Sequence, residues 1–340
     1  MSKRFPMPMP FGWFCISYSD ELAAGAVRNV RYFERDMVLF RTASGKPALT
    51  GPVCPHLGAH LGHGGTVQGE SIRCPFHHWQ FDRDGIITDI PYAQRIPPKV
   101  DGKPCLKTYP VCEKNGVIWA WYHPEELPPD FEVLELAEFS DPDWSERDRY
   151  EWRFGSCPQE IAENGVDVAH FKYIHQMDAV PLGETTYEGH IRRSRVRGPR
   201  TVVNEAGEPE VIEYGIDVVQ NGAGQKWTRF SGLVDYLLQV LVTPVDAETV
   251  DVRFVYTHPR YPEGSFRHRA VRDGIANTNG QRGLEGDIPI WHNKFHLREP
   301  LLCDGDGPIM RFRRYFAQFY VGGPYGDERS IPSDLEVASN

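Results

Sequence analysis

The chain has 340 residues, of which 40% are hydrophobic and 25% are charged, and its formal net charge is -10. This length suggests two domains, and the composition is ordinary for a globular enzyme. The acidic balance argues against nucleic acid or an anionic membrane surface as a partner. No segment reaches the roughly 18 apolar residues of a membrane span, and the start lacks a signal-peptide core, so a cytoplasmic protein is expected.

Short segments with strand character follow one another from residue 12 to about residue 122. They include residues 37–41, 71–74, 85–89 and 116–122. Closely spaced strands with turn residues between them predict a small antiparallel β domain. We place this domain at residues 1–125, followed by an acidic, proline-containing linker at residues 126–143.

Two short segments in this region each contain one cysteine and one histidine. Cys54 and His56 form C-x-H, and after 17 further residues Cys74 and His77 form C-x2-H. Two thiolates for one iron and two imidazoles for the other are the ligands of a Rieske [2Fe-2S] cluster. A structural zinc site is the alternative, but zinc sites usually pair cysteine with cysteine and histidine with histidine. Three neighbouring histidines fall outside this spacing and are expected not to bind metal: His60, His63 and His78.

Residues 144–340 mix helical and strand patterns and are expected to form a second domain. Helices are predicted at 158–174, 265–277 and 288–298, and strands at 201–219, 226–243 and 249–258. Strands enclosed by helices predict an α+β domain that holds a cavity. A basic stretch after the first helix is expected to be a solvated strand or a docking surface for an acidic protein: Arg192, Arg193, Arg195, Arg197 and Arg200.

Polar residues recur on the predicted helix 158–174. Asp167 and His170 lie three apart and share a face with Glu163. His170 and His175 are five apart, so they converge on one ion only if the helix bends or ends between them. Two histidines need a carboxylate to complete the facial triad of non-heme Fe(II). Three aspartates are candidates: Asp287, Asp304 and Asp306. The alternatives are a helix N-cap for the first and a turn for the other two.

Other side chains are expected to have ordinary roles. Phe76 and Trp79 are expected to cover the cluster and pack in the core. His292 and His296, spaced four apart, are expected on a solvated helix face.

The cluster pattern followed by D-x2-H-x4-H resembles the oxygenase component of the Rieske non-heme iron oxygenases, and the resemblance spans nearly the whole chain. It implies an N-terminal antiparallel β Rieske domain and a C-terminal catalytic domain with an antiparallel sheet and helices, of helix-grip type. Asp167 resembles the carboxylate that bridges the cluster of one subunit and the iron of the next, which implies a homotrimer. The implied ligands are Cys54, His56, Cys74 and His77 for the cluster, and His170, His175 and Asp287 for the iron.

Residues 54–65, 300–309 and 313–320 resemble the steroid-acting branch, which includes 3-ketosteroid 9α-hydroxylases and Neverland-type cholesterol 7-desaturases. The resemblance implies that a ferredoxin or ferredoxin reductase passes electrons from NAD(P)H to the cluster, and that O2 is used to hydroxylate a C–H bond of a steroid. Sterol desaturation, aromatic-ring oxygenation or demethylation, and a Rieske-type electron carrier are the alternatives. Five apolar residues are expected to line the substrate pocket, or equally to be ordinary core: Phe230, Leu233, Tyr236, Leu237 and Leu241.

Overall fold

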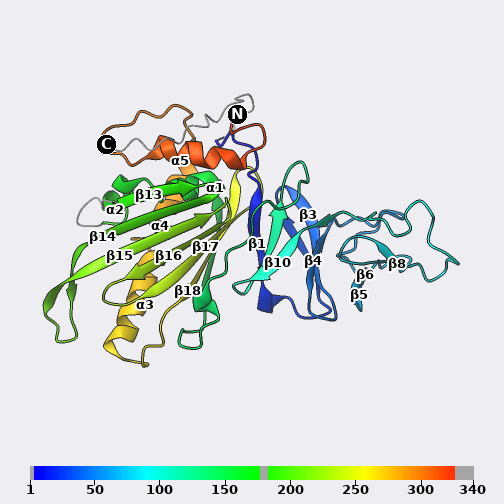
Figure 1. The fold of residues 1–340 in the computed structure, drawn as a ribbon, viewed down its shortest axis with the longest axis horizontal. Helices are drawn as coiled ribbons and strands as arrows, with labels where there is room; N and C mark the ends of the chain where they lie inside the picture. The colour runs from blue at the N-terminus through cyan, green and yellow to red at the C-terminus, as the bar shows by residue number, and fades with distance from the viewer. Residues whose placement is uncertain (1–3, 177–182, 326–340) are drawn as a thin grey trace. The chain divides into compact units, whose positions relative to one another are not determined.

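The computed structural model describes residues 4–176 and 183–325, which group into two compact units (Figure 1). The N-terminal unit comprises residues 12–141 and 243–246, and the C-terminal unit comprises residues 4–11, 142–242 and 247–325. Part of the expected linker is packed in the N-terminal unit, where Phe131 and Val133 are buried and the Phe131 ring contacts Trp121. The domain boundaries at 125 and 143 stay a prediction.

The N-terminal unit consists of short antiparallel strands in sheets with the orders β1-β11-β10, β2-β3-β4-β9 and β5-β6-β7-β8. Its elements are β1 (Gly12–Tyr18), η1 (Ser19–Glu21), β2 (Val27–Tyr32), β3 (Arg35–Arg41), β4 (Pro47–Thr50), β5 (Thr66–Gln68), β6 (Ser71–Arg73), β7 (Gln80–Phe81), β8 (Ile87–Asp89), β9 (Thr108–Tyr109), β10 (Val111–Lys114), β11 (Val117–Tyr122) and η2 (Ala137–Phe139). The strands predicted around residues 37–41, 71–74, 85–89 and 116–122 are β3, β6, β8 and β11. Cys54 and Cys74 lie in the buried core with Val38, Ile72 and Phe81.

The C-terminal unit is built on an antiparallel sheet of order β12-β18-β17-β16-β15-β14-β13. Its elements are β12 (Asp148–Gly155), α1 (Pro158–Glu163), α2 (Val168–Tyr173), β13 (Gly183–Glu188), β14 (Ile191–Val203), β15 (Pro209–Asn221), β16 (Gln225–Ser231), β17 (Tyr236–Pro244), β18 (Thr249–Thr257), α3 (Phe266–Asn279), α4 (Leu284–Asn293), α5 (Ile309–Phe316) and η3 (Ala317–Phe319). Sheets with helices against one face confirm the predicted α+β class.

One face of this sheet packs against helices. Alternate residues of β17, such as Leu238 and Val240, form a buried cluster with Ile161 of α1, Ile275 of α3 and Trp291 of α4. We call this side of the sheet the helix-covered face (Figure 1). Side chains alternate along a strand, so only every second residue of each strand reaches it.

Several predicted elements are divided in the structure. The single helix expected at 158–174 is two helices, α1 and α2, because Asp167 starts the second as its N-cap. Residues 201–219 hold the end of β14, a turn in which the Asn204 side chain accepts two backbone N–H groups, and part of β15. Residues 226–243 hold β16 and β17, which are separated at Gly232. The strand at 249–258 and the helix at 265–277 are confirmed as β18 and α3.

The basic stretch is a strand, β14, but its side chains alternate between two environments. Arg193, Arg195, Arg197 and Arg200 are exposed, as expected for a solvated strand. Arg192 is 0% exposed, so the expectation is wrong for this residue. Among the residues that the structure describes, no helix is long and apolar enough to cross a membrane.

Candidate metal centres

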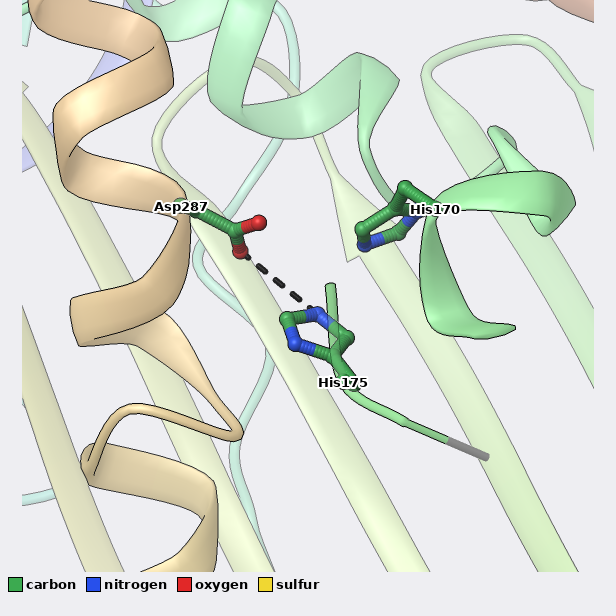
Figure 2. A group of neighbouring side chains, drawn as sticks. All are labelled: His170, His175 and Asp287. Atoms are coloured by element: carbon green, nitrogen blue, oxygen red, sulfur yellow. Dashed lines mark ion pairs between the residues drawn. The ribbon is translucent and has the colours of Figure 1, made fainter. Parts of the chain in front are cut away.

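Three side chains from separate segments of the C-terminal unit point toward one another (Figure 2). His170 lies in α2, His175 follows the end of that helix, and Asp287 lies in α4. One ligand atom from each residue lies within 4.8 Å of the others. His175 Nε2 is 3.6 Å from an Asp287 carboxylate oxygen. The structure thus brings together two imidazoles and one carboxylate, the donor set of a non-heme iron facial triad.

The end of α2 explains how two histidines five apart can converge. The last helical residue is Tyr173, and the Ile174 N–H still donates to the His170 carbonyl at 2.8 Å. The chain then leaves the helix, which turns His175 back beside His170 with 4.7 Å between ring centroids. At the other end, the Asp167 carboxylate accepts a hydrogen bond from the His170 N–H at 3.3 Å and caps the helix. The required break in the predicted helix is therefore present.

The carboxylate of this group comes from Asp287. Helix α4 begins after Gly283, so Asp287 lies inside the helix and the N-cap alternative is wrong. Its carboxylate is hydrogen-bonded to Asn164, which follows α1. Asp306 instead accepts a hydrogen bond from the Cys303 N–H at 2.8 Å. This contact is consistent with the alternative role of Asp306 in a turn. Helix α4 was expected to begin later in the chain because Pro289 suggested a first-turn position.

Burial disfavours the charged forms of these groups. It lowers the pKa of His175 to about 4, with the neighbouring His170 as a second cause, and a neutral imidazole is the form that binds metal. Burial also raises the pKa of Asp287 to about 7, and a bound cation would reverse that effect. His175 Nδ1 is buried and has no hydrogen-bond partner in residues 4–176 and 183–325. The three residues fit a bound dication.

The two cysteine and histidine loops of the N-terminal unit have matching backbone geometry. The Cys54 N–H donates to the Ala59 carbonyl at 2.9 Å, and the Cys74 N–H donates to the Trp79 carbonyl at 2.8 Å. Each loop is therefore closed by a hydrogen bond that spans the same number of residues. This closure holds the cysteine at the base of its loop, where both side chains are buried at 2% exposure.

The four side chains of these loops fit a two-iron cluster. The ring centroids of His56 and His77 are 4.7 Å apart, and buried His77 Nδ1 has no hydrogen-bond partner in the described part of the chain. Burial raises the pKa of Cys54 to about 11, and direct binding to iron would hold the thiolate form. Two thiols and two imidazoles in adjacent loops match the Rieske donor set.

The aromatic residues beside the cluster loops differ from each other. Trp79 stacks on His56 with 4.5 Å between centroids and packs against the core, as expected. Phe76 is 60% exposed, so it does not pack in the core. His60 Nδ1 accepts a hydrogen bond from the Gly62 N–H at 3.1 Å, a local turn contact.

His296 was expected on a solvated helix face and is instead buried. Helix α4 ends at Asn293, and the following segment places His296 Nδ1 at 2.6 Å from a Glu160 oxygen and Nε2 at 2.7 Å from the Tyr325 hydroxyl. The interaction joins residues that are distant in sequence, which the four-residue spacing could not indicate. His292 is exposed, as expected.

Sequence reasoning missed Gly307 as a support of the metal-binding segment. A Cβ atom at Gly307 would lie 1.8 Å from the Val166 carbonyl oxygen and 3.3 Å from the Val168 nitrogen. The tract after Cys303 therefore packs directly on the turn between α1 and α2. The signal in the sequence was a glycine where any side chain would separate the two backbones.

Gly307→Ala is expected to displace this turn and weaken iron retention at His170. Overpacking of this kind costs about 1–3 kcal/mol, so the melting temperature should fall as well. Iron content and thermal unfolding measure the two effects. Gly305→Ala is the control, because within residues 4–176 and 183–325 its Cβ would meet only the Cys303 sulfur, at 3.8 Å. Equal iron content in the two variants would contradict the role of Gly307.

Known proteins resemble the chain in both units. Residues 12–110 match the Rieske [2Fe-2S] domain, and residues 120–320 match the 3-Ketosteroid 9alpha-hydroxylase C-terminal domain. A probable 3-ketosteroid-9-alpha-monooxygenase oxygenase component of Rhodococcus rhodochrous is 30% identical, covering 91% of this chain and 79% of the relative. A cholesterol 7-desaturase of Xenopus laevis is also 30% identical, and the match covers 94% of this chain and 74% of the relative. The crystal structure of apo dicamba monooxygenase has a TM-score of 0.69 at 17% identity, covering 91% of this chain and 96% of the other, which shows a shared fold.

Proposed function

The chain belongs to the Rieske oxygenases, in the family with the 3-ketosteroid 9alpha-hydroxylase C-terminal domain, and we propose that it hydroxylates a C–H bond of a steroid or sterol. The observation that carries the proposal is the convergence of His170, His175 and Asp287 in the unit that matches this C-terminal domain. A chain that only carried electrons would not need a second group of metal ligands. The electron-carrier alternative is therefore not favoured.

We propose Cys54, His56, Cys74 and His77 as cluster ligands, and His170, His175 and Asp287 as iron ligands. When bound, the cluster would supply single-electron transfer and the iron would supply O2 chemistry. Hydroxylation consumes O2, two electrons and two protons, forms one C–OH group and releases one water. The electrons come from NAD(P)H through a ferredoxin reductase, with or without a separate ferredoxin.

The five apolar residues that were considered as pocket lining are divided between the two faces of the sheet and the turn between β16 and β17. Phe230 and Tyr236 stack with 4.4 Å between centroids on the helix-covered face. Leu237 and Leu241 alternate to the opposite face, and Leu233 lies between β16 and β17. Two of the five residues expected to line the pocket therefore lie on the helix-covered face. Tyr236 belongs to the buried cluster that packs against the helices and Phe230 packs against this cluster, which is the ordinary core role that was the alternative for them.

Desaturation is the second candidate, because a cholesterol 7-desaturase is as similar in sequence as the 3-ketosteroid monooxygenase component. It uses the same oxidant but removes a second hydrogen instead of adding oxygen. The ligand residues serve either outcome equally. The fold shared with dicamba monooxygenase carries no information about an aromatic substrate at this identity.

We propose a homotrimer in which Asp167 connects the cluster of one subunit to the iron of the next. We also propose a cytoplasmic location, which is supported by the five free cysteines outside the cluster loops, since a reducing compartment keeps thiols unpaired.

Asp167→Asn is expected to slow electron transfer to the iron by about 10- to 100-fold, the usual effect of altering a partner of a metal ligand. Asparagine is also a good N-cap, so α2 and bound iron should be retained. Stopped-flow oxidation of the prereduced cluster by O2 with substrate measures the rate, and metal analysis measures iron. Asp167→Ala is the comparison, because it also removes the cap. An unchanged rate in Asp167→Asn would refute the bridge.

Product identification tests the proposed function. The reconstituted protein, a surrogate ferredoxin reductase and NADH are incubated with 3-ketosteroids, cholesterol and small aromatic acids, and products are identified by mass spectrometry and NMR. We expect a steroid alcohol that requires NADH and O2. Turnover of the aromatic acids without turnover of any steroid would overturn the proposal.

A further inference from the structure

Four polar side chains form a row across neighbouring strands of the C-terminal unit. Tyr187 of β13 is directly opposite Arg192 of β14, Arg192 is opposite Gln220 of β15, and Gln220 is opposite Lys226 of β16. Directly opposite residues point to the same face of a sheet. Lys226 is in turn opposite Val240, which belongs to the helix-covered face. We call Tyr187, Arg192, Gln220 and Lys226 the polar row.

The polar row has donors and acceptors that the described residues do not use. The three guanidinium nitrogens of Arg192 have no hydrogen-bond partner there, although the residue is 0% exposed. The Tyr187 hydroxyl and Gln220 Oε1 are also buried without a partner in residues 4–176 and 183–325. A buried charged group is unfavourable unless an opposite charge or hydrogen bonds compensate it. The row therefore has buried donors and acceptors that a ligand group could satisfy.

The side chain of Arg192 is fixed beside the segment that carries the iron ligands. Its Cζ atom lies 5.5 Å from the centroid of the Phe312 ring. A Cβ atom at Gly165 would be 2.9 Å from Arg192 Nη2, so the guanidinium packs against the turn between α1 and α2. Asp167 and His170 follow this turn directly. Arg192 is therefore held in one orientation before any ligand binds.

Lys226 extends the row toward Asp287. It lines a small cavity together with Gln220 and with Ile161 and Ala162 of α1. Burial has the larger influence on Asp287 and His170, but the ammonium charge of Lys226 also acts on both, favouring the ionised carboxylate and the neutral imidazole. In the described part of the chain, no carboxylate forms an ion pair with Arg192 or Lys226. Two cations and one phenol hydroxyl therefore face the same side of the sheet near the metal-binding group.

We propose that the polar row binds the carboxylate of an acidic substrate, so that the chain acts on a steroid with a carboxylate side chain. This inference rests on the proposed function, since the carboxylate belongs to the same steroid molecule whose C–H bond is oxidised. Arg192 forms a forked ion pair with the carboxylate, and Lys226 and the Tyr187 hydroxyl complete its contacts. Strands are spaced about 4.8 Å apart, so two long side chains two strands apart can converge on one carboxylate. A neutral keto group would leave Arg192, which is fully buried, and Lys226, which is partly buried, without a counter-charge.

Calorimetric binding to the oxidised holoprotein, without reductase, tests the inference apart from turnover. The probes are a 3-oxosteroid with a carboxylate side chain and its methyl ester. We expect the acid to bind about 10- to 100-fold more tightly than the ester, the range for hydrogen bonds to charged groups. Arg192→Met and Lys226→Met should each reduce this preference by at least about tenfold and leave the affinity for the ester unchanged.

Arg193→Met is the matched control, because Arg193 is the next residue of β14 and is exposed. It should keep the full preference for the acid. The melting temperature of Arg192→Met should be equal or higher, since the substitution removes a buried unpaired charge. A lower melting temperature with an unchanged preference would assign Arg192 a structural role and overturn the inference.

The same measurements separate this inference from the proposed function. Equal affinity of the acid and the ester, with the ester hydroxylated, would overturn the carboxylate site and leave the steroid oxygenase intact. Binding of benzoate that depends on Arg192, with neither steroid bound, would support the carboxylate site and contradict the steroid substrate.

Discussion

Asp287→Ala is expected to lose the mononuclear iron and to abolish product formation while the cluster remains intact. Asp287 provides the carboxylate of the group whose ligand atoms lie within 4.8 Å of one another. Two imidazoles alone do not complete a facial triad, so iron should fall from about three to about two atoms per chain. Metal analysis, the visible spectrum and steroid turnover measure the three effects.

Glu285→Ala provides a matched control on the same helix. Glu285 is in the first turn of α4 with Asp287, and among the residues that the structure describes its carboxylate accepts only a long hydrogen bond, from Gln281 at 3.4 Å. This variant should keep iron and activity. If Asp287→Ala retained the third iron and turned over steroid, another residue would have to supply the third ligand.

Cys74→Ser is expected to abolish the cluster and all NADH-dependent product formation. Cys74 is 2% exposed, and its loop is closed by a 2.8 Å hydrogen bond from the Cys74 N–H to the Trp79 carbonyl. Because this loop fixes the backbone, a serine hydroxyl would occupy nearly the same position as the thiol. A hydroxyl is a poor ligand for an iron-sulfur cluster, which is held by thiolates. The protein should lose its colour and its Rieske EPR signal while His170, His175 and Asp287 still hold one iron per chain.

Cys105→Ser is the comparison for this experiment. Cys105 lies in the same unit, packs beside the same core, and belongs to neither cluster loop. It should keep the cluster spectrum and turnover. A normal EPR signal in Cys74→Ser, or its loss in Cys105→Ser, would show that the cluster ligands were assigned incorrectly.

The parts of the site that depend on local spacing were predictable from the sequence. Cys54 with His56 and Cys74 with His77 fall within single loops, so their order alone indicated a mixed thiolate and imidazole site. His170 and His175 were paired by spacing, and the requirement for a helix end between them is met after Tyr173. Asp287 was one of three candidates by position, because the contact between α4 and the end of α2 is not visible in local patterns.

The features that the sequence did not predict arise from contacts between distant segments. Arg192 points to the face of β14 opposite to Arg193, Arg195 and Arg197, and it is buried because Phe312 of α5 and Gly165 lie over it. His296 is buried because its Nδ1 atom is hydrogen-bonded at 2.6 Å to the carboxylate of Glu160, which lies far earlier in the chain. Charge alone suggested solvent exposure for both residues. Their burial required knowledge of which helix covers each side chain.

A single-turnover reaction with labelled oxygen tests the central claim most directly. The fully reduced protein, free of reductase, is mixed with a 3-oxosteroid and 18O2, and the steroid is analysed by mass spectrometry while cluster oxidation is followed by absorbance. We predict a steroid alcohol that carries one 18O atom and forms as the cluster is oxidised. The cluster could instead be oxidised without any oxidised steroid being formed. If this happened with both the carboxylate-bearing and the neutral 3-oxosteroid, it would contradict a steroid oxygenase.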